Sequence, residues 1–369
     1  MDNGRVTLSE LRRVAVARSL FTPTTLPQAL DTLGFVQADP IRAPARAQDL
    51  TLRHRVTGYR AGDLERLYPS LDIHEDFFVN YGFVTPAVQA LMHPRSGHTP
   101  WTAAQGRHVR GLLDFVHTRG TAHPREVAEH FAHGTVTNYW GGSSSATTQL
   151  LDAMHYRGLL RVARREAGIR IYAVHEHQAG PLDVAARRAR LDALIDVIVG
   201  TYAPLPAASL SALVRRLRFA VQQWAGELDR ALHRAKQRLA HARVEAVDWY
   251  WPASEPLSTH LATAEPVDVV RLLAPFDPVV WDRRRFEILW GWAYRFEAYT
   301  PLPKRKLGYY ALPLLWRDQV VGWGNLSVKN ATLLTDFGYV ASRPPRDKAF
   351  RGALDEELHR VRDFLGLDS

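Results

Sequence analysis

Residues 143–174 read "SSSATTQLLDAMHYRGLLRVARREAGIRIYAV". The first half has the apolar spacing of a helix, and the second half alternates on both sides of Ala167-Gly168, which predicts a strand, a tight turn and a second strand. Two further helices precede this stretch: residues 107–120 end at a glycine, and residues 123–131 carry a proline in their first turn. Three helices followed by a two-stranded hairpin are the element order of a winged helix, so we expect a DNA-binding module here.

The residues of this module that would meet DNA follow from its expected geometry. In helix-turn-helix proteins the recognition helix lies in the major groove, and its first residues contact bases and phosphates. Those positions here carry short hydroxyl side chains, and the expected wing carries arginines. The candidate DNA contacts are Ser143, Ser144, Ser145, Thr147 and Thr148 on the helix and Arg161, Arg164, Arg165 and Arg170 on the wing.

The N-terminal region predicts a similar module. Residues 7–20 begin with Thr7 and Glu10, the spacing of a capping box, and predict an amphipathic helix. Residues 26–34 predict a second helix that stops at a glycine, and a short strand follows. Residues 45–56 return to a helical period with a basic face, so Arg42, Arg46 and Arg53 are further candidates for DNA contact.

The rest of the chain predicts a third helical module and then a β-rich region. From about residue 271 the sequence is aromatic and β-branched with frequent turn signals, which predicts a small antiparallel barrel or sheet, and a last helix follows. A cationic loop between the aromatic strands, Lys304, Arg305 and Lys306, is either a DNA contact or a solvated turn. The expected fold class is α+β, with winged-helix domains at residues 1–100, 101–180 and 181–270 and a C-terminal β-barrel with a terminal helix at 271–369.

Composition favours a soluble protein with a polyanionic partner. The formal charge is +9, from 47 basic and 38 acidic residues, and nucleic acid is the usual partner of such a chain. Only 5 of the basic residues are Lys, however, and an arginine bias can also reflect genome composition. The chain has no cysteine, no signal peptide at its start and no run of about 20 apolar residues. We expect a cytoplasmic, nucleoid-associated monomer.

Several enzyme classes find no support in the sequence. The P-loop, GxGxxG, GxSxG and HExxH motifs are all absent, so no motif supports a nucleotide-dependent enzyme or a serine hydrolase. One acidic cluster could bind Mg²⁺ or Mn²⁺ in a nuclease, but we favour a solvated loop there. We expect no metal and no cofactor. The cluster comprises Asp72, His74, Glu75 and Asp76.

A small polar site is expected in "GFVQADPIRAPARAQDL", residues 34–50. Gln37 and Asp39 are two residues apart at the end of the short strand, and alternation along a strand would turn both side chains to one side. From the pattern alone, the favoured explanation is a helix-capping turn at Asp39-Pro40 and a Gln37 side chain whose hydrogen bonds are satisfied within the protein.

Several motifs occur together in a distinctive order. They are Gln-apolar-Asp-Pro at 37–40, "ARAQDLTLRHR" at 45–55, "WGGSSSATTQLLDAMHYRGLLRVARRE" at 140–166, "LLAPFDPVVWDRRR" at 272–285 and "TPLPKRKLGYYALPLL" at 300–315. This order resembles the winged-helix DNA glycosylases of the AlkZ/YcaQ type over most of the chain. The resemblance implies three tandem winged helices and a C-terminal β-barrel that hold duplex DNA. It also implies removal of N7-alkylated guanines and, in some members, unhooking of interstrand crosslinks.

The resemblance also implies catalytic residues. The family motif is Gln-apolar-Gln or Gln-apolar-Asp, and Gln37 and Asp39 match the second form. Alkylation at N7 makes guanine a cationic leaving group, so a carboxylate that stabilises the sugar cation and activates water suffices for hydrolysis. Asp39 is the candidate carboxylate, and Gln37 would position the water or the sugar. The partner would be double-stranded DNA with alkylated bases. The rival hypotheses are a non-catalytic winged-helix regulator and, more remotely, the metal-dependent nuclease.

Overall fold

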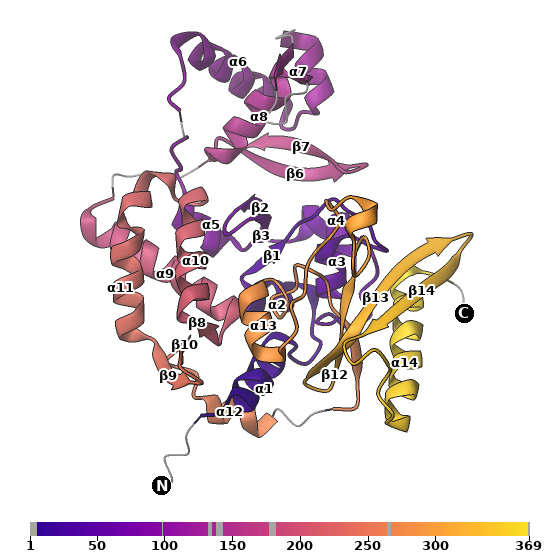
Figure 1. Cartoon of the computed structure of the whole chain (residues 1–369). Coiled ribbons are helices and arrows are strands. Elements are labelled where there is room, and N and C mark those ends of the chain that lie inside the picture. The colour runs from indigo at the N-terminus through magenta and orange to yellow at the C-terminus, as the bar shows by residue number, and fades with distance from the viewer. Residues whose placement is uncertain are drawn as a thin grey trace. The chain divides into compact units, whose positions relative to one another are not determined.

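The computed structural model describes residues 6–97, 99–131, 135–137, 143–176, 182–263 and 267–367. The chain forms helices and short sheets (Figure 1) and divides into two compact units. Unit 1 comprises residues 1–64, 195–214 and 232–369, and unit 2 comprises residues 65–194 and 215–231. The expected series of four domains stays a prediction, because each unit draws on several of them. Within the described ranges, no helix is both long enough and apolar enough to cross a membrane.

The N-terminal part of unit 1 confirms the predicted helices. Thr7 and Glu10 form the capping box, and Gly34 ends the second helix in the left-handed conformation at φ 65°, where glycine has no steric penalty. The strand that follows is only three residues long. The elements are α1 (Leu8–Ser19), α2 (Leu26–Leu33), β1 (Phe35–Gln37), α3 (Ala47–Leu52) and α4 (Asp63–Leu67).

The region expected to be a helical third module also contains a sheet. Its strands pair in the order β8-β10-β9 within unit 1. Val247 opposes Val244 across a tight connection at Glu245 and Ala246, both with positive φ. The elements are α9 (Val184–Tyr202), β8 (Leu205–Pro206), α10 (Ala207–Arg216), the 3₁₀ turns Leu217–Phe219 and Gln222–Glu227, α11 (Leu228–Arg238), β9 (Ala240–Val244), β10 (Val247–Trp251) and α12 (Leu257–Thr263).

The C-terminal region is an open sheet, so the expected closed barrel is wrong. Its strands are antiparallel neighbours in the order β11-β12-β13-β14, and among the described strands β11 and β14 are the two edges. In the described part of the chain, β11 pairs with β12 alone and β14 pairs with β13 alone, and β14 is largely exposed. The elements are β11 (Val270–Leu272), α13 (Arg283–Trp290), the 3₁₀ turn Leu302–Lys304, β12 (Leu312–Trp316), β13 (Gln319–Lys329), β14 (Thr332–Tyr339) and α14 (Lys348–Leu365).

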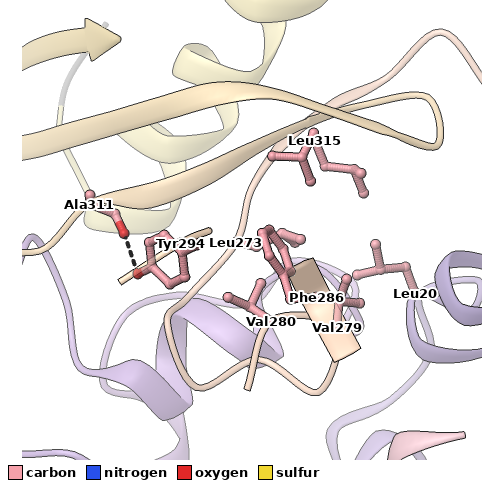
Figure 2. Packing of buried hydrophobic residues seen from close by; sticks show 9 residues of the cluster. Leu20, Leu273, Val279, Val280, Phe286, Tyr294, Ala311 and Leu315 are labelled. Carbon is pink, nitrogen blue, oxygen red and sulfur yellow. Dashed lines mark hydrogen bonds between the residues drawn. The ribbon is translucent and has the colours of Figure 1, made fainter. Parts of the chain in front are cut away.

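A buried cluster in unit 1 holds the "LLAPFDPVVWDRRR" segment in place (Figure 2). Phe286 is fully buried at its centre, with the rings of Trp290 and Tyr294 within 6 Å. Each buried apolar side chain of this size contributes roughly 1.5–3 kcal/mol. The buried members are Leu20, Leu273, Val279, Val280, Phe286, Tyr294, Ala311, Leu315 and Val320.

Unit 2 contains the three helices and hairpin expected at residues 107–174. The hairpin turns at Ala167 and Gly168, both with positive φ, which confirms that prediction. The third helix begins only at Ala146, because residues 143–145 form a strand. The tandem winged-helix arrangement stays a prediction. The elements are the 3₁₀ turn Tyr68–Ser70, β2 (His74–Phe77), β3 (Tyr81–Val84), α5 (Pro86–Met92), α6 (Ala103–Arg119), α7 (Pro124–Phe131), β4 (Thr135–Thr137), β5 (Ser143–Ser145), α8 (Ala146–Tyr156), β6 (Leu160–Glu166) and β7 (Ile169–Val174).

Candidate active site

Gln37 is the last residue of β1, and its side chain is buried. The indole Nε1 of Trp281 donates a hydrogen bond of 2.6 Å to its Oε1. An indole N–H can only donate, so the bonded atom of the amide must be its oxygen, and the NH₂ group is left to meet a ligand. Trp281 is itself held by its backbone N–H, which donates to Asp277 O at 2.8 Å. The orientation of Gln37 is therefore set by the "LLAPFDPVVWDRRR" segment.

Asp39 lies beyond the end of β1, so strand alternation does not position it. Two local contacts do. Its Oδ1 accepts a hydrogen bond from Ile41 N at 2.9 Å across Pro40, and its backbone N donates to Gln48 Oε1 of α3 at 3.2 Å. With Oδ1 engaged, Oδ2 is the oxygen that can act on a ligand. The pattern alone favoured a helix-capping turn here, but the N-cap residue of the following helix α3 is Arg46. Asp39 instead forms a turn with Ile41, and this turn presents a nearly buried carboxylate.

The surroundings of Asp39 favour its protonated form. Burial raises the pKa of Asp39, and the hydrogen bond from Ile41 N–H lowers it in part. The negative charge of Asp39 also acts on two tyrosines. Burial is the main cause that raises the pKa of Tyr299 and of Tyr310, and the charge of Asp39 is the second cause for both. Tyr299 is 79% exposed, whereas Tyr310 is 2% exposed. A carboxylate with a raised pKa beside aromatic side chains is typical of a catalytic acid or base.

The buried ion pair between Arg55 and Asp277 connects the segments that form this site. The guanidinium of Arg55 is fully buried and bonds both carboxylate oxygens of Asp277 at 2.7 and 2.9 Å. Arg55 also donates to Ser19 O of α1 and Thr51 O of α3. Asp277 therefore connects the helices around the Gln37–Asp39 segment to the segment that carries Trp281.

The cationic loop Lys304–Lys306 is organised by a buried carboxylate. Glu297 is 6% exposed, and its Oε2 accepts hydrogen bonds from the backbone N–H groups of Lys306 and Leu307 at 2.8 and 2.7 Å. Lys304 and Lys306 have exposed side chains. Arg305 is half-buried, donates to Thr300 O and lies over the ring of Tyr309. The two lysines are thus the members of the loop that can meet phosphate.

The predicted basic face after the Gln-Asp motif is not exposed as expected. Arg53 follows α3, bonds Glu357 of α14 and donates to Leu272 O of β11 at 3.0 Å, so only 4% of its side chain is exposed. Arg46 caps α3 and is half-buried. Arg42 is exposed. Of these three arginines, Arg42 is the exposed one, and Arg53 has a structural role. The DNA contacts expected of Arg42 and Arg46 stay predictions.

The arginines of the wing also include both exposed residues and residues held in internal ion pairs. Arg165 bonds the buried Glu75 of β2, with Nε to Oε1 at 2.7 Å. Burial by itself would raise the pKa of Glu75, but the bonds and charge of Arg165 hold it below its usual value. Arg170 pairs with Asp152 at 3.0 Å, and Arg164 pairs with the neighbouring Glu166. Arg161 is exposed. Arg165 and Arg170 therefore stabilise unit 2 through internal pairs.

The hydroxyl residues expected at the start of the recognition helix are also divided. The backbone of β5, which pairs with β4, carries Ser143, Ser144 and Ser145. The structure describes only the backbone of these three residues. Thr147 is buried in α8, and Thr148 is exposed on the same helix. The DNA contacts predicted for these residues stay predictions.

The acidic cluster at residues 72–76 is not a solvated loop. Glu75 and Asp76 lie in β2 and are each 1% exposed. Asp76 bonds His93 Nε2 at 2.6 Å and Arg95 at 2.9 Å. Burial by itself would raise the pKa of Asp76, but the charge of Arg95 and the contact with His93 hold it well below its usual value. In the ranges that the structure describes, no three His, Asp or Glu side chains are placed to hold a metal ion. The nuclease hypothesis has no support here, because protein cations already occupy both carboxylates.

A family model described as "DNA glycosylase AlkZ-like" matches residues 30–364. The chain belongs to this family. Membership implies DNA glycosylase activity, a DNA substrate and a role in DNA repair. A solved structure described as Streptomyces sahachiroi DNA glycosylase AlkZ is similar to this AlkZ-like chain, with a TM-score of 0.63 and 14% sequence identity over 98% of both chains. At that identity the likeness shows the fold alone.

Sequence reasoning missed three side chains that build the site of this AlkZ-like protein. Trp281 orients Gln37, Asp277 anchors Arg55, and Tyr310 lies within the electrostatic reach of Asp39. All three belong to motifs that carried the family resemblance. Their place in these motifs was the only feature of the sequence that could have identified them, because each side chain and its partner lie more than two hundred residues apart along the chain.

Proposed function

We propose that this AlkZ-like protein hydrolyses the N-glycosidic bond of N7-alkylated purines in duplex DNA. The observation that carries the proposal is a nearly buried carboxylate, Asp39, with one oxygen engaged and a raised pKa, two residues from an amide whose orientation Trp281 sets. Interstrand crosslinks made through the same purine nitrogen are a second class of substrate. Because no step needs a metal, chelators should not affect the reaction.

The proposed reaction uses these two side chains in turn. The bond between C1′ and N9 breaks, and its electron pair neutralises the cationic base, which leaves without a general acid. Asp39 stabilises the sugar cation electrostatically and accepts a proton from the attacking water, whose oxygen bonds C1′. The Gln37 NH₂ group donates to the water or to a sugar oxygen. The products are free base and an abasic site.

Base release tests the proposal directly. Excess protein is incubated with duplex DNA that carries 7-methylguanine, with a nitrogen-mustard crosslink or with unmodified duplex, and released base is measured by chromatography. We expect release from the first duplex and unhooking of the second, with none from the third. Binding without release from any adduct would favour the non-catalytic regulator.

Trp281 offers a test of the amide's orientation. Trp281→Phe keeps the aromatic packing but removes the donor to Gln37 Oε1, so the amide can turn its oxygen toward the water. We expect single-turnover excision to slow by about tenfold, the scale of one lost hydrogen bond, with little change in DNA affinity.

A second tryptophan is a matched control for that variant. Trp290 Nε1 donates to Asp318 O at 2.9 Å, so Trp290→Phe loses an equivalent bond elsewhere in unit 1. We expect its excision rate to match the wild type. Equal slowing in both variants would mean that tryptophan packing, and not the orientation of Gln37, controls the rate.

The cationic loop should contribute to DNA affinity. Lys304→Ala/Lys306→Ala removes the two exposed lysines and keeps Arg305, which has structural partners. Each lost phosphate contact lowers the slope of log affinity against log salt by about 0.9, so we expect a change of about 2. The melting temperature should not change. The control Lys236→Ala/Lys348→Ala removes equal charge from α11 and α14, and an equal loss of affinity there would show that only net charge matters.

A further inference from the structure

A pocket of about 600 Å³ opens in unit 1 beside the Asp39 turn. Arg42 and Pro44 line it from the segment that follows Asp39, Tyr309 and Tyr310 line it from the loop before β12, and Asn325 and Asp336 line it from β13 and β14. The volume suits a small organic molecule, and more than half of the lining residues are aromatic or apolar. Two of these residues were introduced above, Arg42 as a candidate DNA contact and Tyr310 as a neighbour of Asp39, but no ligand has yet been assigned to the space itself.

The hydroxyl of Tyr310 is an unusual feature of the pocket. Its oxygen is buried and has no hydrogen-bond partner, and 2% of the residue is exposed. Its neighbour Tyr294 is equally buried, but the Tyr294 hydroxyl donates to Ala311 O at 2.7 Å (Figure 2). Buried polar atoms are nearly always paired, since an unpaired one loses its hydration without compensation. The Tyr310 hydroxyl therefore needs another explanation.

Asn325, which also lines the pocket, carries a second unpaired atom. Its Nδ2 donates to Leu307 O at 2.8 Å, and a backbone carbonyl can only accept, so the amide orientation is determined. The buried Oδ1 is then a hydrogen-bond acceptor without a partner. The amide packs against Gly308, where an added Cβ would come within 2.3 Å of Oδ1. The backbone thus leaves room for this amide in this position.

We propose that the pocket receives the alkylated purine, with the Tyr310 hydroxyl donating to O6 of guanine and Asn325 Oδ1 accepting from its N1–H. The inference rests on the proposed glycosylase function and names the part of the site that reads the base. The 6-oxo group and N1–H are adjacent on the Watson–Crick edge, an acceptor beside a donor, and the two lining residues with unpaired atoms carry a donor, Tyr310 OH, and an acceptor, Asn325 Oδ1. The Tyr309 ring and the Asp336 carboxylate also suit a cationic base.

Binding of the free base tests the pocket separately from catalysis. Calorimetric titration of the full chain with 7-methylguanine is compared with titration by 1,7-dimethylguanine, which has a methyl group in place of the N1 hydrogen. We expect the wild type to bind the first base and to bind the second at least tenfold more weakly. Asp39→Asn should keep this preference, so base binding and excision can fail independently.

Two tyrosine variants make the test specific. Tyr310→Phe should weaken 7-methylguanine binding about tenfold and leave the melting temperature unchanged or slightly higher, because its hydroxyl has no partner in the free protein. Tyr294→Phe should lower the melting temperature and keep the affinity. Asn325→Ala should abolish the preference between the two bases. Equal affinity of the wild type for both bases, or unchanged affinity in Tyr310→Phe, would overturn the proposal whether or not the protein excises 7-methylguanine from DNA.

Discussion

Asp39→Asn is expected to lower single-turnover excision of 7-methylguanine by about 10²-fold or more, the usual scale for a catalytic base or electrostatic residue. Asparagine keeps the shape of the side chain and can still accept the hydrogen bond from Ile41 N–H, but it carries no charge and cannot take a proton from water. Affinity for the same duplex should be retained. A variant that excises at the wild-type rate would contradict the mechanism.

The raised pKa of Asp39 gives this prediction a dependence on pH. The reaction needs the carboxylate, so excision should fall as pH drops through the raised pKa, at a higher pH than an ordinary aspartate with a pKa of about 3.9 would give. A rate profile whose acid limb follows the ordinary value would contradict the assignment. Asp39→Asn should lose that limb.

The same shift predicts a gain of stability in the variant. The folded chain holds the Asp39 proton more tightly than the unfolded chain, so Asp39 favours folding at low pH and this contribution is lost as pH rises through the folded pKa. At neutral pH the ionised carboxylate therefore opposes folding. We expect Asp39→Asn to melt at a higher temperature than the wild type at pH 7, with a difference that narrows as pH falls. Such a trade between stability and function is common at catalytic groups.

Asp277→Asn is expected to destabilise the protein by about 3–5 kcal/mol, measured as a shift of the urea unfolding transition. In the wild type, both carboxylate oxygens of Asp277 are bonded to the Arg55 guanidinium. The variant leaves this fully buried guanidinium without its counter-charge. A double variant, Arg55→Met/Asp277→Leu, should recover much of the loss, because removal of both charges also removes the cost of burying them.

An exposed pair provides the control for that experiment. Arg243 and Asp248 are 68% and 44% exposed and are 3.3 Å apart across the β9–β10 hairpin. Asp248→Asn should change stability by less than about 1 kcal/mol, because water screens that pair. If Asp277→Asn were as mild as Asp248→Asn, Arg55 would not depend on Asp277, and the ion pair could not be what holds the site together.

The candidate site was only half visible from the sequence. Gln37 and Asp39 could be named from the family motif, but the alternation argument placed Asp39 on a strand that ends two residues earlier. The Asx turn to Ile41 and the contact with Gln48 position it instead. The sequence also could not distinguish a C-terminal sheet from a barrel, because alternation and turn signals are the same in both.

The sequence by itself determined the elements whose signals are local. The Thr7 and Glu10 cap, the Gly34 stop and the Ala167-Gly168 turn each depend on backbone hydrogen bonds and φ values within a few residues, so their positions could be predicted. Only the tertiary structure decided which arginines are held in internal ion pairs. Arg165 lies 90 residues from Glu75, and Arg53 lies 304 from Glu357. The sequence alone does not show whether an arginine pairs with a phosphate or with a distant carboxylate of the same chain. That choice depends on which side chains the fold buries next to one another.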